Sequence, residues 1–302
     1  MSLSLSREMT TTLTSALTSL EITSVNQVRR FILSQINSDG GFCGRDSESD
    51  LYYTLFGVEC LTAFGIPFPE AKILNYLKQF GAGENLDFVH LICLIRCLAK
   101  LSKIPLDENL LNRLLENLKP FQFENGLFRQ TVDSKSPSLY AGFLAALAFE
   151  EIGVVTINQA ATLKLIEQMK TSDYAFADQE GVEFGTTPVT AAVVGLLAKW
   201  QQPIDPKTVA WLLAREAPDG GFLAIPKAPV ADLLSTATTL FALKVMNHSF
   251  QGISENIFDF VENLWHENGG FFGNVLDKTP DCEYTFYGLL SIGVLTEILN
   301  LD

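Results

Sequence analysis

The sequence predicts an all-α fold in which six helical hairpins close into a ring around a central apolar cavity, an α6–α6 barrel. Two observations support this prediction. A similar segment recurs six times along the 302 residues, and each copy supplies one amphipathic and one strongly apolar helix. The copies of the apolar helix start at Asp50, Asp87, Ser138, Thr186, Asp232 and Asp281.

Ring closure is favoured over an open array of repeats. An open solenoid needs terminal repeats with a polar outer face. The last apolar helix, which starts at Asp281, is as apolar as those in the middle of the chain. A closed ring therefore places the last repeat beside the first, and it gathers all six helix starts at one end of the barrel.

The chain divides into a short N-terminal part and the barrel. Residues 1–24 are rich in Ser and Thr, and we expect a leader with a short amphipathic helix over 7–20. The barrel domain then spans 25–302. In each repeat the first helix is amphipathic and belongs to an outer ring. These outer helices are expected at 25–36, 69–80, 110–118, 157–169, 206–215 and 253–265.

The second helix of each repeat is apolar on almost every side, which predicts an inner ring of buried helices. These inner helices are expected at 51–64, 87–101, 139–152, 189–200, 233–246 and 284–298. Glycine-rich turns precede several of them, such as Gly40-Gly41-Phe42, Gly220-Gly221-Phe222 and Gly269-Gly270-Phe271. The turns and the inner-helix starts should together form the mouth of the cavity.

Composition limits the classes of partner. The net charge is −14 and the basic residues form no cluster, so nucleic acid is not expected as a partner. Five cysteines, an odd number with no Cys-x-x-Cys pair, predict a reduced chain in the cytoplasm. No apolar run is long enough to span a membrane.

The mouth is the predicted site because carboxylates converge there. Asp at a helix start is explained by capping of free backbone N–H groups. Capping does not explain Glu283, which follows two residues after Asp281. Carboxylates that cluster beside an apolar cavity raise one another's proton affinity, which is what a general acid requires. The acidic residues expected on this arc are Asp50, Asp87, Asp232, Asp281 and Glu283.

Glu283 is the first candidate for the acid, with Asp281 in support, and Asp87 with His90 is the second. His90, Cys93 and Cys97 share one helix face, yet a packed stripe explains them better than a metal site does, since zinc needs three or four ligands. We therefore predict no metal.

The segments "GGFCGRDSESDLYYTLFGVECLTAFG" and "GGFFGNVLDKTPDCEYTFYGLLSIG" resemble the prenyltransferase and squalene-oxidase repeat. The resemblance covers nearly the whole chain. Within this superfamily the chain looks most like single-domain bacterial class II terpene cyclases of the merosterolic acid synthase type. Those cyclases carry an Asp-x-Asp-Asp-Thr pattern. Aligned on Thr285, it places Glu283 at the position of the acid and Asp281 at the supporting position.

The same superfamily contains protein prenyltransferase β subunits, which bind zinc through Asp-x-Cys-Tyr. Here Glu283 occupies the Cys position, and Cys282 is displaced by one residue. The resemblance thus implies a protonation-initiated cyclase that folds a linear isoprenoid into fused rings, with terpene or meroterpenoid products. The alternatives are a protein prenyltransferase β-like subunit and a non-catalytic isoprenoid-binding barrel.

Aromatic faces stabilise carbocations, so several aromatic residues are expected to line the cavity, with ordinary core packing as the alternative. The predicted substrate-binding residues are Asp50, Tyr52, Tyr53, Phe56, Tyr140, Phe143, Asp232, Tyr284 and Tyr287. The expected partner is a hydrophobic isoprenoid, and a peripheral membrane contact for its uptake stays open. No cofactor is expected, except Mg²⁺ if the substrate carries a diphosphate. Lys135, Lys227 and Lys278 each precede an inner helix and could meet an anionic head group, carboxylate or diphosphate, with solvated loop lysines as the alternative.

Overall fold

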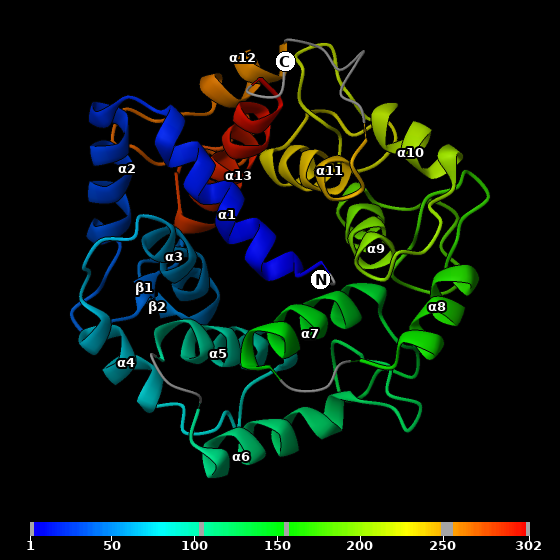
Figure 1. Ribbon diagram of the computed structural model, residues 1–302, viewed down its shortest axis with the longest axis horizontal. Helices are drawn as coiled ribbons and strands as arrows, with labels where there is room; N and C mark the ends of the chain where they lie inside the picture. The colour runs from blue at the N-terminus through cyan, green and yellow to red at the C-terminus, as the bar shows by residue number, and fades with distance from the viewer. Residues whose placement is uncertain (1–2, 103–105, 154–156, 249–255, 300–302) are drawn as a thin grey trace.

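The computed structural model describes residues 3–102, 106–153, 157–248 and 256–299, which form thirteen α-helices and one short hairpin (Figure 1). The inner ring consists of α3 (Leu51–Ala63), α5 (Phe88–Leu101), α7 (Leu139–Ile152), α9 (Thr187–Lys199), α11 (Leu233–Val245) and α13 (Cys282–Leu299). The outer ring consists of α2 (Ile22–Ser34), α4 (Glu70–Lys78), α6 (Glu108–Leu118), α8 (Gln159–Gln168), α10 (Pro206–Leu213) and α12 (Asn256–Asn263).

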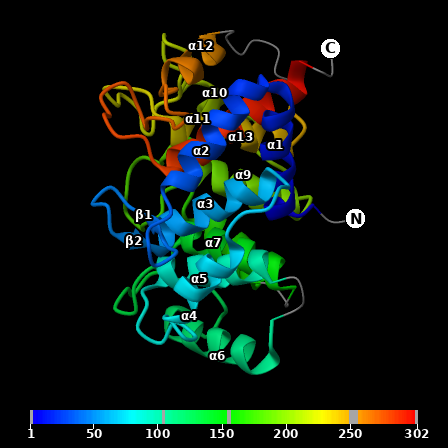
Figure 2. The ribbon, with the colours of Figure 1, turned by 90° about the vertical axis from the view of Figure 1, so that its left-hand side faces the viewer.

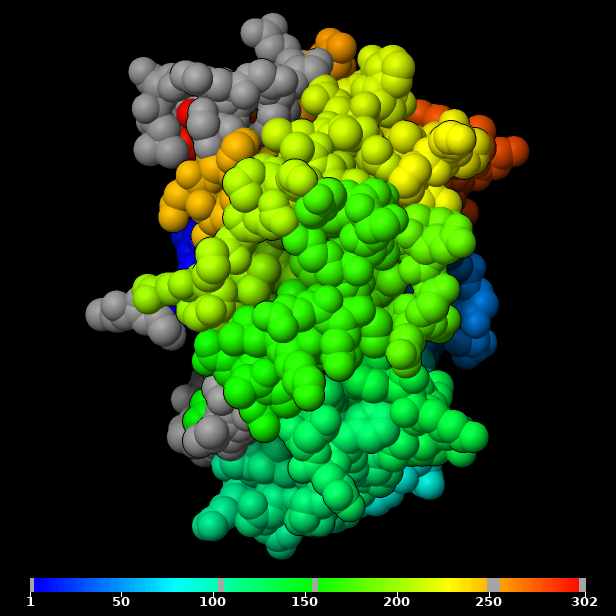
Figure 3. All heavy atoms as spheres, turned by 90° about the vertical axis from the view of Figure 1, so that its right-hand side faces the viewer, coloured from blue at the N-terminus to red at the C-terminus, as the bar shows by residue number. Residues whose placement is uncertain are grey.

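The ring is closed, as predicted. Helix α13 packs against α3 as well as against α11, so the last repeat meets the first (Figure 1). From the side, the third to fifth repeats form one continuous wall (Figure 3). The core runs through all six inner helices. No helix in the described ranges combines the length and the apolarity needed to cross a membrane.

Helix boundaries differ from expectation by a few residues, for local reasons. Helix α9 begins at Thr187 rather than 189, because Pro188 is tolerated in a first helical turn, where its missing N–H costs no bond. Helix α13 begins at Cys282, directly after its capping residue. In the outer helix expected at 253–265, residues 253–255 lie outside the described part of the chain, and α12 ends at Asn263.

The glycine-rich turns share one construction. A phenylalanine after each turn is buried and forms a backbone bridge to the end of the preceding outer helix, as Phe222 does with Glu216. Its N–H donates to a threonine hydroxyl in the first turn of the inner helix. This hydrogen bond joins Phe42 to Thr54 (3.0 Å), Phe176 to Thr190 (3.1 Å), Phe222 to Thr236 (2.9 Å) and Phe271 to Thr285 (3.2 Å). In the first repeat the bridge extends into a hairpin, β1 (Phe42–Cys43) with β2 (Ser49–Asp50).

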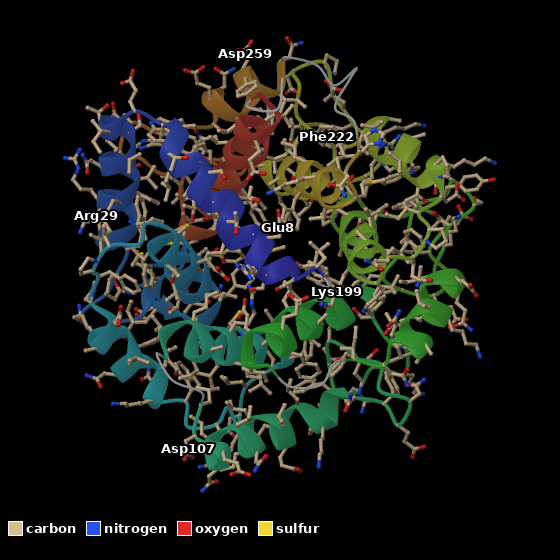
Figure 4. The ribbon with its side chains drawn as sticks, viewed as in Figure 1. Glu8, Arg29, Asp107, Lys199, Phe222 and Asp259 are labelled. Carbon is tan, nitrogen blue, oxygen red and sulfur yellow. The ribbon has the colours of Figure 1, made fainter. Side chains whose placement is uncertain are left out.

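Helix α1 (Leu5–Ser19) lies across the end of the barrel opposite the turns (Figures 1 and 2). Its apolar face, with Leu5, Leu13 and Ala16, is buried against the inner ring, above all against α13. Glu8 on this helix lies near the centre of the ring, whereas Arg29, Asp107 and Asp259 project from outer helices (Figure 4). The amphipathic helix expected at 7–20 runs from Leu5 to Ser19, and it covers the end of the barrel opposite the mouth.

Two acidic residues of α7 hold the start of α1. Glu150 Oε2 accepts from the Ser4 hydroxyl and from the Ser6 N–H, both at 3.0 Å. The Ser6 hydroxyl donates to Glu151. Lys199 pairs with Glu150 from the end of α9 (Figure 4). The contact with the Ser6 N–H satisfies one of the backbone donors that a helix start leaves without an intrahelical partner.

Candidate active site

An apolar cavity of about 300 Å³ lies on the axis of the barrel. Five of the predicted aromatic residues line it: Tyr52, Phe56, Tyr140, Phe143 and Tyr287. Phe286, the neighbour of Tyr287, lines it as well, and Met9 of α1 contributes from the closed end. The cavity has the size and the mostly apolar lining of a small-molecule site.

The aromatic rings pack against one another rather than separately. The Phe56 ring lies 5.0 Å from that of Tyr52, 5.2 Å from that of Phe286 and 5.7 Å from that of Tyr287, between centroids. On the facing wall Tyr140 stacks on Phe143 at 6.3 Å. Such contacts hold the rings in fixed orientations, so the faces turned to the cavity are already ordered.

All six residues at the inner-helix starts are N-caps. Each side chain accepts a hydrogen bond from a backbone N–H in the first helical turn, the bond expected for these residue types. The caps are Asp50, Asp87, Ser138, Thr186, Asp232 and Asp281. What distinguishes the six positions is the environment of the remaining oxygen atoms.

Glu283 lies in the first turn of α13 and is hydrogen-bonded across the closure of the ring. The Tyr52 hydroxyl donates to Glu283 Oε1 at 2.6 Å. The pKa of Glu283 is raised to about 7, chiefly by burial and in small part by the nearby Asp281, while the Tyr52 hydrogen bond opposes the rise. Glu283 itself does not line the cavity, but Tyr52 does. The Tyr52 hydroxyl thus connects the Glu283 carboxyl to the cavity.

Asp281 supports this end of α13. One oxygen caps the helix through the Tyr284 N–H at 2.8 Å, and the other accepts from Arg45 Nε at 2.9 Å. Arg45 also pairs with Asp277 at 2.7 Å. Burial is the main cause that raises the pKa of Asp281, and the guanidinium counteracts it. Arg45, in the first repeat, was not anticipated from the sequence because it precedes its helix by a loop.

His90 joins the first two inner helices at the mouth. Its Nδ1 lies 2.7 Å from Asp87 Oδ2, and its Nε2 lies 3.2 Å from Asp50 Oδ2. The hydrogen bonds to Asp50 and Asp87 raise the pKa of His90 to about 9, against the effect of its burial, and the pKa of Asp50 is lowered in turn. At neutral pH this is an imidazolium between two carboxylates. None of the three lines the cavity.

On the far side of the mouth, two further carboxylates are enclosed by donors. Asp232 accepts from the N–H and the hydroxyl of Ser235, and burial raises its pKa. Asp178 accepts from the Ser138 hydroxyl and the Tyr140 N–H at 2.9 Å each, and burial raises its pKa too. Asp178 lies in a loop and does not belong to the repeated sequence pattern, so the sequence carried no signal for it.

The remaining predicted residues lie outside the cavity wall. Tyr284 packs its ring against the Arg45 guanidinium at 5.3 Å. Tyr53 packs edge-on against Tyr52 but does not reach the cavity. Cys282 is fully buried in the core. Lys135, Lys227 and Lys278 lie in the loops that precede inner helices, and they do not line the cavity. Across the described ranges, no three His, Cys, Asp or Glu side chains are grouped as a metal site.

Arg96 was missed as a cavity residue because it lies within the apolar middle stretch of α5, between Ile95 and Cys97. It lines the cavity from α5 and is only 7% exposed. Its guanidinium contacts Glu59 of α3 at 2.6 Å and Glu151 of α7 at 2.9 Å. Lys100, one turn later on α5, contacts Glu59 at 2.9 Å. Four buried charges thus lie between the cavity and α1.

Comparison with solved structures places the fold among enzymes with different activities. The type II terpene cyclase MstE from Scytonema, in complex with its product merosterolic acid A, matches 96% of this chain and 99% of its own, with 14% identity and a TM-score of 0.62. The protein geranylgeranyltransferase-I of Candida albicans, complexed with GGPP, matches 100% of this chain and 93% of its own, with 15% identity and a TM-score of 0.64.

An α-amylase from Clostridium perfringens also matches 90% of this chain and 97% of its own, with 11% identity and a TM-score of 0.61. At such identities the likeness concerns the fold alone. No curated protein matches the chain by sequence.

The sequence itself fits one family model, the prenyltransferase alpha-alpha toroid domain, in three overlapping stretches over residues 9–81, 71–229 and 189–302. Together these stretches cover nearly the whole chain, including α1 from Met9 onward and all twelve helices of the two rings. The chain therefore belongs to the prenyltransferase alpha-alpha toroid family.

Proposed function

We propose that the protein is a class II terpene cyclase, which protonates the terminal alkene or epoxide of a linear isoprenoid and closes it into fused rings. One observation carries the proposal. A carboxyl group with a pKa near 7, Glu283, is hydrogen-bonded to Tyr52, and Tyr52 lines an aromatic cavity. A carboxylic acid that keeps its proton near neutral pH is suited to general acid catalysis.

The proton travels from Glu283 to the substrate through Tyr52. In the acid form of Glu283 the carboxyl O–H donates to the Tyr52 oxygen, and the phenolic O–H is turned to the cavity. As the carboxyl gives its proton to the Tyr52 oxygen, the phenolic proton passes to one alkene carbon, which leaves the other carbon cationic, or to the epoxide oxygen, whose C–O bond breaks to leave a hydroxyl and a cationic carbon. Glu283 is left as a carboxylate, which takes up a proton from solvent before the next turnover. Successive alkene π bonds then attack the cation and form the rings. Loss of a proton from the last cation ends the reaction, so an alkene substrate yields an isomer of unchanged mass.

The cavity supplies what the cationic intermediates need. Ring faces carry negative potential and attract cations. The Phe56 ring packs against the rings of Phe286 and Tyr287, and it also packs against the ring of Tyr52. The lining is mostly apolar, which keeps water away from intermediates that water would quench. No step of this reaction requires a metal or an organic cofactor. Mg²⁺ would enter only with a diphosphate substrate.

The comparisons agree with an isoprenoid as ligand. Two of the similar structures hold an isoprenoid compound, merosterolic acid A in the cyclase and GGPP in the transferase. Between these two chemistries, the residues here favour protonation. Cys282, the residue nearest in sequence to a thiolate ligand, is buried in the core, whereas Glu283 bonds to a residue of the cavity wall.

The test is turnover by the purified protein of a geranylgeranylated aromatic acid and of geranylgeranyl diphosphate, followed by chromatography with mass spectrometry. A product of unchanged mass and altered retention is expected. Glu283→Gln should abolish it without loss of the helical circular dichroism signal. Glu262→Gln, on the exposed side of outer helix α12 in the same repeat, is the matched control.

Other outcomes would replace the proposal. Full activity in Glu283→Gln would remove Glu283 as the acid. Release of diphosphate together with bound zinc and transfer of the prenyl group would indicate a prenyltransferase β-like subunit. Binding of the isoprenoids with no product at any pH would indicate a non-catalytic binding barrel.

A further inference from the structure

The cavity has a second polar end, which the proposed reaction does not use. Val89, Ile92, Cys93 and Arg96 of α5 follow one another along a single wall of the cavity. Arg96 is the deepest of the four, and its partner Glu151 also accepts from Ser6 of α1. A guanidinium at the end of an apolar wall is a candidate to bind a polar group of the ligand.

The guanidinium is held on two of its three nitrogen atoms. Nε donates to both oxygens of Glu151 at 3.1 Å, and Nη2 donates to Glu59 at 2.6 Å and to Glu151 at 2.9 Å. Nη1 makes no hydrogen bond with any residue of the described ranges. Unlike a completely enclosed nitrogen, Nη1 keeps some accessible surface, and its residue lines the cavity.

The charges around Arg96 already balance. Arg96 and Lys100 face Glu59 and Glu151, with contacts of 2.6 to 3.4 Å, so two basic groups meet two acidic ones. Burial raises the pKa of Glu59, and the two cations beside it oppose that rise. An anionic ligand would bring an uncompensated charge into this buried place, at a large cost in desolvation. A neutral oxygen needs only the free N–H donors of Nη1. The chemistry therefore favours a hydroxyl, carbonyl or ether oxygen over a diphosphate.

The two polar ends are separated along the barrel. Counted from the equivalent caps Asp281 and Asp87, Glu283 is the second residue of its helix and Arg96 the ninth. Seven residues of α-helix correspond to about 10 Å along the axis. Between these levels the lining consists chiefly of apolar side chains, and the hydroxyl of Thr238 is turned back to its own helix.

We propose that Arg96 Nη1 anchors a neutral oxygen head group of an isoprenoid at the closed end of the cavity. The chain then extends toward the mouth, and its terminal alkene lies beneath Tyr52 and Glu283. The orientation of the alkene rests on the proposed cyclase function, whereas the anchor does not. Arg96 acts here as a binding and positioning residue that selects the class of head group.

The experiment measures binding in the Glu283→Gln background, where the proposed reaction cannot consume the probe. Equilibrium dialysis compares farnesol, the hydrocarbon farnesene and farnesyl diphosphate. We expect farnesol to bind about tenfold more tightly than farnesene, the effect of one good hydrogen bond in an apolar site, and farnesyl diphosphate to bind more weakly than farnesol.

Arg96→Lys separates the anchor from the structural charge. Lysine keeps a cation beside Glu59 and Glu151 but lacks the guanidinium fork. The advantage of farnesol over farnesene should vanish, while the affinity for farnesene stays the same. Arg113→Lys, on the exposed outer face of α6, is the matched control. Thermal melts monitor folding, and if Arg96→Lys does not fold, the nitrogen-15 resonance of Arg96 Nη1 in the parent protein must shift with farnesol.

Three results would overturn the anchor: equal binding of farnesol and farnesene, an advantage of farnesol that persists in a folded Arg96→Lys, or tightest binding of the diphosphate. The cyclase proposal fails separately. A preference for farnesol that depends on Arg96, with no cyclised product from the wild-type protein, would keep the anchor and refute the cyclase. Cyclised product from the wild-type protein, without a preference for farnesol over farnesene, would keep the cyclase and refute the anchor.

Discussion

The six side chains that start the inner helices share one backbone role, but their surroundings give them different proton affinities. Asp50 accepts from His90, and its pKa is lowered. Asp281 and Asp232 are buried, and their pKa values are raised. Glu283, two residues after Asp281, does not cap the helix, so its carboxyl can hold a proton. One repeated motif thus produces both structural carboxylates and one candidate acid.

The pH dependence of turnover tests this assignment. Because the protonated form of Glu283 is the donor and its pKa is about 7, the rate should be level below pH 7. Above it, the rate should fall about tenfold per pH unit. A rate that rises with pH through this range would contradict an acid role for Glu283.

Replacement of Tyr52 by Phe should act on both the rate and the pKa. The phenol relays the proton, so we expect turnover to fall about 10²- to 10⁴-fold. The hydrogen bond from Tyr52 stabilises the carboxylate, so its loss should raise the pKa of Glu283 above 7, as followed by carbon-13 NMR of that carboxyl group. Tyr53→Phe is the control, since Tyr53 makes no hydrogen bond to Glu283. An unchanged pKa in Tyr52→Phe would show that the hydrogen bond is not formed in solution.

At the scale of elements, glycine and phenylalanine explain how the repeated turn meets the inner helix. A Cβ on Gly57 of α3 would lie 2.2 Å from the Phe42 ring, and one on Gly288 of α13 would lie 2.6 Å from the Phe271 ring. Only a hydrogen at these positions lets the phenylalanine lie flat on the helix. The turn and the inner helix therefore pack as a pair, so a substitution of the glycine or the phenylalanine would change the shape of the mouth.

Gly57→Ala should therefore lower the free energy of unfolding by about 1–3 kcal/mol through overpacking against Phe42. Gly142→Ala in α7 is a control with the opposite expected sign. No atom lies within 4 Å of a Cβ there, and alanine should stabilise the helix by about 0.5–1 kcal/mol. Urea denaturation of both variants checks the pair, and equal effects would contradict the packing argument.

Helix α1 is the element whose position could not be predicted. Its apolar spacing indicated a helix, but nothing in residues 1–24 identifies the surface that receives it. That surface includes α13, where Gly293 allows the Thr12 carbonyl to approach, α3, and Glu150 and Glu151 on α7. These partners are far apart in sequence and have no repeated pattern. By contrast, the two rings follow from local periodicity, and the pairing of Tyr52 with Glu283 depends on ring closure.

The contribution of α1 to stability can be measured at Leu13, which is completely buried. Leu13→Ala should lower the free energy of unfolding by about 2–5 kcal/mol, the cost of a cavity in a packed core. Thr11→Ala, at an exposed position of the same helix, should change it by less than about 0.5 kcal/mol. If both variants melt like the wild-type protein, α1 is not docked in solution as it is in this structure.

For the molecule as a whole, three electrostatic effects act in the same direction on stability. The pKa of Glu283 is raised in the folded state, so its contribution is lost as pH rises from about 4.5 to 7, by about 3 kcal/mol. The pKa of His90 is raised as well, so its contribution is complete below pH 6.5 and lost as pH rises through about 9. Since His90 is partly exposed, its share is about 1 kcal/mol. The net charge of −14 adds self-repulsion at high pH.

The free energy of unfolding should therefore decline steadily from pH 5 to pH 9, as measured by urea denaturation at fixed ionic strength. Glu283→Gln should remove the decline below pH 7 and leave the decline above it. His90→Ala should have the complementary effect. A stability maximum near pH 8 would contradict both assignments.

Closure of the ring has a consequence for the order of events during synthesis. Tyr52 lies on α3, near the beginning of the chain, and its partner Glu283 lies on α13, the last inner helix. A growing chain emerging from the ribosome can pair its early repeats with one another, but it cannot unite these two residues until α13 has emerged and packed against α3. If the protein is the proposed cyclase, a partly made barrel would hold part of the substrate-binding surface without its proton donor. The proposed reaction would become available only once α13 has packed against α3.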